Sequence, residues 1–93
     1  MPTPLPNDRI DAWLRSRTGW TRSGIAITRQ FELPTFPAAI AFVKRVADLA
    51  EGMNHHPDIA ISWSQVEVAL STHSEGGVTE NDLKLAAKVE ELA

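Results

Sequence analysis

Apolar residues recur every three or four positions through the middle of the chain. This spacing places them on one face of an α-helix, with the charged residues off that face. Pro37 suits the first turn of a helix, where its missing N–H costs nothing, and Gly52 suits the end. We therefore expect a core-facing helix over residues 37–51. Its apolar stripe is Ala39, Phe42, Val43, Val46, Leu49, Ala50 and Met53.

Shorter helical patterns lie towards both ends of the chain. A helix is predicted over residues 8–17, with Asn7 as its N-cap and Ile10, Trp13 and Leu14 on one face. A last helix is predicted after a capping box, in which a threonine and an acidic residue three positions later satisfy each other's backbone N–H groups. The residues of this helical signal are Thr79, Asp82, Leu83, Ala86, Val89 and Leu92.

Two pairs of segments alternate between apolar and polar residues, as β-strands with one buried face do. In the first pair, a strand opens at Gly19 and Trp20, and a tight turn at Ser23 and Gly24 leads into residues 25–31. We expect these two segments to form a hairpin. The apolar face of the second segment is predicted to comprise Ile25, Ile27 and Phe31.

The second pair begins with a predicted strand over residues 59–63, after which Ser64 and Gln65 turn the chain. The next strand alternates strictly. Continuing its period of two puts Thr72 on the apolar face and His73 on the polar face. The apolar face is predicted to comprise Val66, Val68 and Leu70.

The resulting order is helix, two strands, helix, two strands, helix. It predicts an α+β fold in which a four-stranded antiparallel sheet carries its helices on one face. Residues 7–93 are predicted to form a single domain behind a flexible, proline-rich leader, residues 1–6. The open edges and the bare face of such a sheet favour association of two or more copies.

Composition excludes several classes of function. The chain has 93 residues, no cysteine and a formal net charge of −3, without a cluster of lysine or arginine. Disulfides and thiolate chemistry are excluded, and direct binding to nucleic acid is not expected. No apolar run reaches the roughly 18 residues of a membrane span, and no basic and apolar signal sequence is recognisable. We expect a cytoplasmic protein.

All three histidines lie within nineteen residues. His55 and His56 precede Pro57, and His73 ends the last predicted strand. Histidine is the side chain whose ordinary pKa lies nearest neutrality, so it can give or take a proton at working pH. The cluster therefore indicates acid–base chemistry.

These histidines form part of a longer motif. An acidic residue, His-His-Pro, an aromatic residue, a third histidine and an aspartate follow at spacings that resemble those of the pterin-4a-carbinolamine dehydratases. The motif residues are Glu51, His55, His56, Pro57, Trp63, His73 and Asp82. The resemblance extends over roughly residues 9–92, with one departure: Ile59 stands where animal members of the family usually have an aromatic residue.

The resemblance implies that water is removed from 4a-hydroxytetrahydropterin to give quinonoid dihydropterin. Reduction of that product regenerates tetrahydrobiopterin for aromatic amino-acid hydroxylases. It implies no metal and no organic cofactor, and assembly as a homodimer or homotetramer. Some animal members also serve as a dimerisation cofactor for a homeodomain transcription factor, so a non-catalytic protein-interaction module is the alternative function.

The resemblance also implies roles for individual residues. His55 and His73 form the acid–base pair, with the assignment of acid and base left open. His56 holds the pterin, and Asp82 fixes the tautomer of an imidazole. The catalytic set is thus His55, His56, His73 and Asp82. The implied substrate-binding set is Trp20, Glu51, Pro57, Asp58, Trp63, Ser71 and Thr72.

The residues by themselves leave structural alternatives open. The adjacent histidines could cap the carbonyls of the preceding helix, and His73 could be an ordinary exposed residue at a strand end. Asp82 is fully explained by its capping box. A metal site of these histidines and an aspartate is a further class of function, disfavoured because adjacent histidines seldom reach one metal.

Three other candidates have equally plain interpretations. Trp20 and Trp63 are expected in the hydrophobic core, with contact between Trp20 and a ligand as the alternative. Glu51 is expected to be a solvated residue near a helix C-terminus, where its charge is slightly unfavourable.

Overall fold

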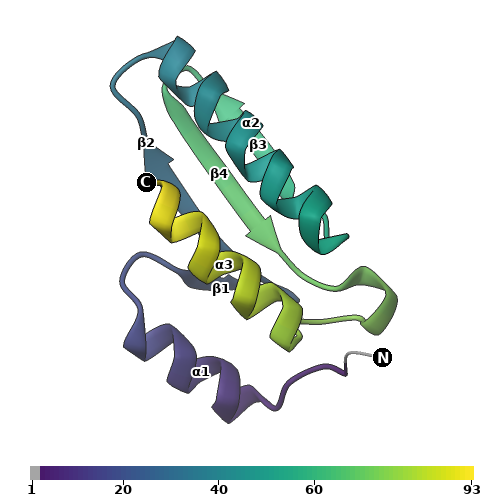
Figure 1. Ribbon diagram of the computed structural model, residues 1–93. Helices are drawn as coiled ribbons and strands as arrows, with labels where there is room; N and C mark the ends of the chain where they lie inside the picture. Colours follow the sequence, from purple (N-terminus) through teal and green to yellow (C-terminus); the bar gives the residue numbers. More distant parts are fainter. Residues whose placement is uncertain (1–2) are drawn as a thin grey trace.

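The computed structural model describes residues 3–93 and follows the predicted order of elements (Figure 1). The four strands are all antiparallel, in the order β1-β2-β4-β3. The α+β architecture predicted from the sequence is therefore confirmed. The elements are α1 (Asn7–Ser16), β1 (Thr21–Ser23), β2 (Ala26–Glu32), α2 (Phe36–Met53), β3 (Asp58–Ser62), β4 (Gln65–Leu70), the 3₁₀ helix η1 (His73–Glu75) and α3 (Glu80–Leu92).

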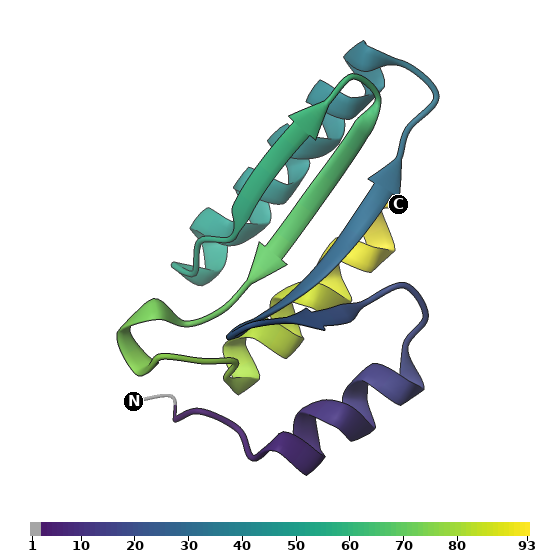
Figure 2. The same ribbon diagram turned by 180° about the vertical axis from the view of Figure 1, so that it is seen from behind.

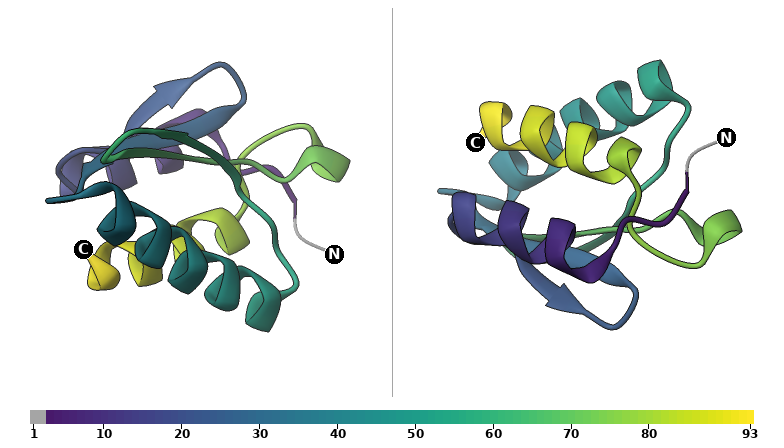
Figure 3. Two further views of the ribbon diagram at one scale, coloured as in Figure 1. Left: turned by 90° about the horizontal axis from the view of Figure 1, so that it is seen from above. Right: turned by 90° about the horizontal axis from the view of Figure 1, so that it is seen from below.

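Helices α2 and α3 lie side by side over one face of the sheet, in front of it in Figure 1 and behind it in Figure 2. Helix α1 lies beyond α3, beside β1. The views from above and from below show the same layering (Figure 3). The other face of the sheet is polar where the central strands pair, for example at Gln30 opposite Glu67.

Within residues 3–93, no helix combines the length and the apolar character needed to cross a membrane.

The predicted apolar face of β4 is fully buried. Val66 lies opposite Phe31, and Leu70 lies opposite Ile27, so both strands turn these side chains towards the helices. Ile25, predicted on the same face, is instead exposed, because it occupies the turn between β1 and β2. Gly24 provides the positive φ that begins this two-residue turn.

Helix α2 confirms the predicted stripe but is longer than predicted at both ends. Thr35 caps its N-terminus by accepting a hydrogen bond of 3.1 Å from the backbone N–H of Ala38. The prediction that Gly52 ends the helix is wrong, since Gly52 is helical. The left-handed C-cap is Asn54, with φ of 50°. Asparagine tolerates this conformation better than most residues with a side chain.

Helix α1 also begins one residue earlier than predicted. Pro6 is its N-cap, and Asn7 is the first helical residue, with no side-chain capping bond. Within the predicted leader, the backbone N–H of Leu5 donates to the carbonyl of Val78 at 2.8 Å. Met1 and Pro2 lie outside the described residues, so the division into a leader and a domain stays a prediction.

Two boundaries in the second hairpin differ from the prediction. Trp63 and Ser64 form the turn, because Ser62 pairs with Gln65, and Trp63 is 80% exposed. The prediction of Trp63 in the core is therefore wrong. Strand β4 ends at Leu70, so His73 does not continue the strand but begins η1.

A chain of aromatic rings joins α1 to α2 through the core. The ring centres lie 6.0 Å apart for Trp13 and Trp20, 6.2 Å for Trp20 and Phe31, and 4.9 Å for Phe31 and Phe42. These tilted arrangements are favoured for aromatic pairs. Trp20 is 4% exposed, which confirms its prediction as a core residue.

Candidate active site

The end of α2 brings His55 against the start of α3. The left-handed Asn54 turns the chain, and the backbone N–H of His55 still bonds the carbonyl of Ala50 at 3.0 Å. The His55 side chain then meets Asp82, with 2.5 Å between Nε2 and Oδ1. The imidazole is 11% exposed and the carboxylate is fully buried. The structure thus joins two of the predicted catalytic residues.

Asp82 is fixed from its other side by two threonines. Its Oδ2 accepts a hydrogen bond of 2.8 Å from the backbone N–H of Thr79 and one of 2.9 Å from the hydroxyl of Thr72. The two threonine hydroxyls lie 2.8 Å apart. The capping box predicted at Thr79 is therefore present, and the same carboxylate also faces His55. One carboxylate thus makes both the capping contact and the contact with His55, and its catalytic role stays a prediction.

This arrangement determines what His55 can do with a proton. A carboxylate only accepts hydrogen bonds, so a neutral His55 places its proton on Nε2 and leaves a lone pair on Nδ1. A carboxylate behind an imidazole also stabilises the charged ring that forms when Nδ1 takes a proton. His55 therefore has the arrangement of a general base.

His56 lies on the solvent side of the same turn. Its Nε2 is 2.5 Å from Oε2 of Glu51, and both side chains are mostly exposed. Glu51 is thus solvated, as predicted, although its pairing with His56 was not predicted. An ion pair with this exposure contributes little to stability, so the pair chiefly orients the imidazole.

His73 is also exposed and points towards the start of β3. Its Nε2 lies 3.6 Å from Oδ2 of Asp58, the residue that follows the His-His-Pro segment. Its chain neighbour Thr72 bonds Asp82, which in turn faces His55. The segments that carry all three histidines therefore converge where α2 ends, η1 lies and α3 begins, at one end of the molecule (Figure 1).

The remaining predicted substrate contacts divide into two groups. Pro57 and Asp58 lie in the converging segments, and Ser71 and Thr72 lie there too but are only 8% exposed. Thr72 turns its hydroxyl to Asp82, so its contact is with the predicted catalytic set. Among residues 3–93, no three histidine, aspartate or glutamate side chains are grouped so as to hold a metal ion.

The two predicted tryptophans lie elsewhere. Trp63 stands at the far end of β3 from Asp58, about 16 Å away at the rise of a β-strand. It borders a hollow of about 310 Å³ together with Phe36. Trp20 is buried, and its indole N–H donates to Glu90 at 2.6 Å. The structure does not bring either ring to the histidines.

Sequence reasoning did not predict that the Thr79 hydroxyl contacts the Thr72 hydroxyl, or that His73 pairs with Asp58. A threonine six residues after a histidine gives no signal of a shared network. The capping box was the available clue, because it predicted that the Asp82 carboxylate turns back towards the residues before α3.

A family model described as pterin 4 alpha carbinolamine dehydratase matches residues 3–92 of the chain. The chain belongs to this family. A protein of Roseiflexus sp. (strain RS-1) is 49% identical over 92 residues, which cover 99% of each chain. One of Mycobacterium tuberculosis (strain H37Rv) is 46% identical over 88 residues, 95% of this chain and 94% of that one. Both carry pterin-4-alpha-carbinolamine dehydratase as a provisional name.

Solved structures of pterin dehydratases share the fold. A crystal structure of a protein of Brucella melitensis, described as a transcriptional coactivator/pterin dehydratase, has a TM-score of 0.93 and 38% identity, covering 98% of this chain and 99% of that chain. A pterin dehydratase-like protein identified as a RuBisCO assembly factor in the alpha-carboxysome has a TM-score of 0.65 and 24% identity, over 80% and 86% of the two chains. At that identity the second likeness shows the fold alone.

Proposed function

We propose that this protein is a hydro-lyase that removes water from a 4a-hydroxytetrahydropterin and releases quinonoid dihydropterin. The observation that carries the proposal is the buried contact of His55 with Asp82, set beside His73 in a chain of the dehydratase family. The carbon–oxygen bond at C4a breaks, a carbon–nitrogen double bond forms, and the neighbouring ring N–H loses its proton. One proton must reach the departing hydroxyl and one must leave the nitrogen.

The surroundings of the two histidines support a division of labour. His55, backed by Asp82, takes the proton from the ring nitrogen through Nδ1. His73, which is exposed and faces Asp58, gives a proton to the hydroxyl as it leaves. His56, held by Glu51, contacts the pterin without transferring a proton. A positioned acid or base typically contributes about 10²- to 10⁴-fold in rate.

The test is the dehydration rate of a 4a-hydroxytetrahydropterin, followed by the absorbance of the quinonoid product. The wild type should accelerate the reaction without added metal, and a chelator should leave the rate unchanged. His55→Ala and His73→Ala should each lower kcat by about 10²-fold or more, and His56→Ala should chiefly raise KM. Unchanged rates in both the His55 and the His73 variants would overturn the proposal.

The physiological setting that we propose is cytoplasmic recycling of tetrahydrobiopterin. An aromatic amino-acid hydroxylase would then supply the substrate. Addition of this protein to such a hydroxylase should shorten the lifetime of the carbinolamine and leave the hydroxylation stoichiometry unchanged.

Self-association is part of the proposal. Strand β3 pairs only with β4, which leaves its outer edge open in the part of the chain that the structure describes. Beside this edge, α2 and the β3–β4 hairpin expose four apolar side chains. We call them the β3-edge patch: Phe36, Ile40, Ile61 and Trp63. An open strand edge beside exposed apolar groups favours pairing with a second copy, so we propose a homodimer or homotetramer that uses this edge.

A protein-interaction module is the second candidate function. The β3-edge patch is the observation that favours it, together with the description of the Brucella melitensis relative as a transcriptional coactivator/pterin dehydratase. Under this hypothesis, substitution of His55 or His73 leaves partner binding intact, and substitution of Trp63 removes it. Under the hydro-lyase hypothesis, the histidine variants lose activity.

A further inference from the structure

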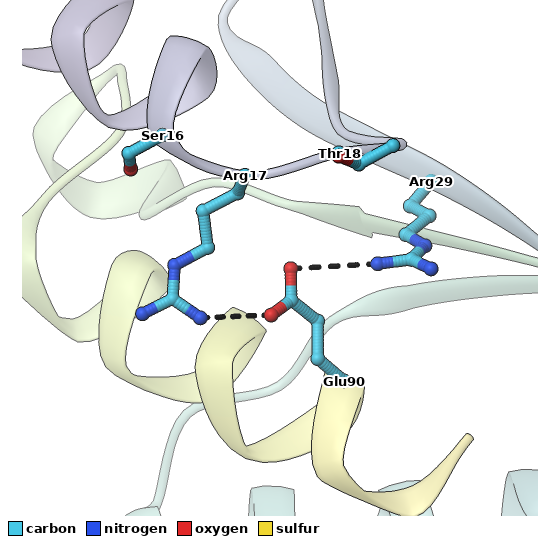
Figure 4. Close-up of a pocket in the computed structure, with 5 residues that line it drawn as sticks. All are labelled: Ser16, Arg17, Thr18, Arg29 and Glu90. Carbon is cyan, nitrogen blue, oxygen red and sulfur yellow. Dashed lines mark hydrogen bonds and ion pairs between the residues drawn. The ribbon is translucent and has the colours of Figure 1, made fainter.

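A polar hollow lies where α1, β2 and α3 meet, and the proposed chemistry does not use it. Its volume is about 590 Å³, and its lining residues are Ser16, Arg17, Thr18, Arg29 and Glu90 (Figure 4). Glu90 lies eight residues after Asp82 on α3, which separates the two sites by about 12 Å along the helix axis. The hollow is therefore distinct from the histidine site.

The charges that line the hollow do not balance. Figure 4 shows Arg17 and Arg29 reaching towards the single carboxylate of Glu90 from opposite sides. Nη1 of Arg17 donates to Oε2 at 2.8 Å, and Nη1 of Arg29 donates to Oε1 at 3.4 Å. Two positive groups and one negative group leave one net positive charge, although the whole chain carries −3.

Both arginines are held in place by neighbours other than Glu90. The guanidinium carbon of Arg17 lies 5.4 Å from the ring centre of Trp13, and that of Arg29 lies 4.7 Å from the ring centre of Phe31. Stacking on aromatic faces orients a guanidinium at low entropic cost. The two positive groups are therefore positioned before any ligand arrives.

Glu90 and Gly19 complete this positioning. The buried indole of Trp20 donates to the same Oε1 at 2.6 Å and fixes the carboxylate. Gly19 has φ of 96°, and a Cβ there would lie 2.8 Å from Nε of Arg29. Only glycine adopts this φ freely while leaving room for the arginine.

The arginines keep donors to spare. A guanidinium carries five N–H donors, and Glu90 engages one nitrogen of each. Arg17 is 36% exposed and Arg29 is 26% exposed, so their remaining N–H groups can be reached from the hollow. The planar fork of an arginine matches the oxygens of a carboxylate or a phosphate.

We propose that this hollow is a binding site for an oxyanion group, phosphate or carboxylate, held between Arg17 and Arg29. Glu90 acts as the spacer that bridges the two guanidinium groups, with one oxygen to each. The net positive charge selects anions over cations, and the arginine forks select flat or tetrahedral oxyanions over halides.

The indole N–H of Trp20 provides a built-in probe for the test, since it bonds the carboxylate that both arginines share. Inorganic phosphate, acetate and chloride are titrated at constant ionic strength while the indole resonances of the three tryptophans are followed by NMR. Phosphate or acetate should shift the Trp20 signal with saturation in the millimolar range, and chloride should not. The Trp63 signal, which lies outside the hollow, serves as an internal reference.

Variants assign the site. Arg17→Gln should weaken phosphate binding by about tenfold or more, because a charge-assisted hydrogen bond is lost. Arg9→Gln is the matched control, since Arg9 also pairs α1 with α3, through Glu80 at 3.1 Å, but lies outside the hollow. It should leave the affinity unchanged. Saturation by phosphate alone would assign a phosphate-bearing ligand, and saturation by both ions would assign oxyanions in general.

Two results would overturn the proposal. One is a Trp20 signal that does not saturate with either oxyanion in the wild-type protein. The other is an equal loss of affinity in the Arg17 and Arg9 variants, which would mean that the ions bind through general charge attraction. Neither result depends on dehydratase activity.

Discussion

Thr72 donates a hydrogen bond of 2.9 Å to Oδ2 of Asp82, the carboxylate whose other oxygen faces His55. Thr72 is buried and belongs to the segment just before His73. Thr72 therefore links the segment that carries His73 to the carboxylate that orients His55.

The first prediction concerns this link. Thr72→Val should lower kcat by about 10- to 100-fold, because a hydrogen bond to a charged group is worth roughly 1.5–3 kcal/mol. KM should change little, since the hydroxyl faces Asp82. Thr72→Ser retains the hydroxyl and should restore most of the rate. The measurement is steady-state dehydration, with circular dichroism to verify folding. A rise in KM at constant kcat would instead indicate that Thr72 contacts the substrate.

The second prediction concerns the exposed pair of Glu51 and His56. Glu51→Gln should change the free energy of unfolding by less than about 1 kcal/mol, because ion pairs in solvent contribute little. It should raise KM modestly, since His56 loses the carboxylate that orients it. Denaturant unfolding and steady-state kinetics measure the two effects. His56→Ala is the comparison, and the double variant should show no further rise in KM. Additive rises would mean that the two side chains act independently.

The third prediction concerns the turn between β3 and β4. Trp63 has φ of 60° at the first position of a two-residue hairpin turn, where Gly24 stands in the turn between β1 and β2. Positive φ at this position favours glycine. Trp63→Gly should therefore raise the free energy of unfolding of the monomer, by up to about 1 kcal/mol. Trp63→Ala keeps a Cβ and should give no such gain. Chemical denaturation at low protein concentration measures both, and equal stabilities of the two variants would show that the backbone of this turn is unstrained.

The fourth prediction concerns self-association through the β3-edge patch. Phe36→Asp with Trp63→Asp should convert the assembly to monomers, because a charge in an apolar interface is costly to bury. Sedimentation velocity measures the change. The matched control is Ile25→Asp, which alters another exposed apolar residue, in the other hairpin turn, beside β1. Monomers in the control as well, or an unchanged assembly in the double variant, would place the interface elsewhere.

The elements predicted best from the sequence are those with a strong local period. The stripe of α2 and the alternation of β4 each place several large apolar residues on one face, and both faces are buried. The capping box likewise depends on two residues three positions apart, Thr79 and Asp82. In each case the information lies within a few residues of the chain.

The errors arose at the ends of elements, where neighbouring residues compete for the same turn or cap. The end of β3 is set by the pairing of Ser62 with Gln65, which moves Trp63 out of the core and into the turn. The end of α2 is set by Asn54, which adopts the left-handed conformation. Glycine adopts this conformation more readily, which is why the sequence favoured Gly52 as the end of the helix. Local residue preferences do not distinguish these alternatives.

The candidate site was predictable in part, because its motif could be read from residue types and spacings. The partners of its histidines were not all predictable. Glu51 and Asp58 reach imidazoles through loop geometry, and the hollow at Glu90 joins residues more than sixty positions apart. Such contacts have no local pattern in the sequence.

The three tryptophans divide into two optical populations. Trp13 and Trp20 are enclosed in the aromatic chain of the core, whereas Trp63 is open to solvent at the β3 edge. In the monomer, a water-soluble collisional quencher such as iodide should therefore extinguish the red-shifted emission of Trp63 and spare the other two, and association through the β3-edge patch should protect Trp63 as well. The unmodified protein thus carries separate fluorescent reporters: one for contact at its outer strand, and a second for the integrity of its interior.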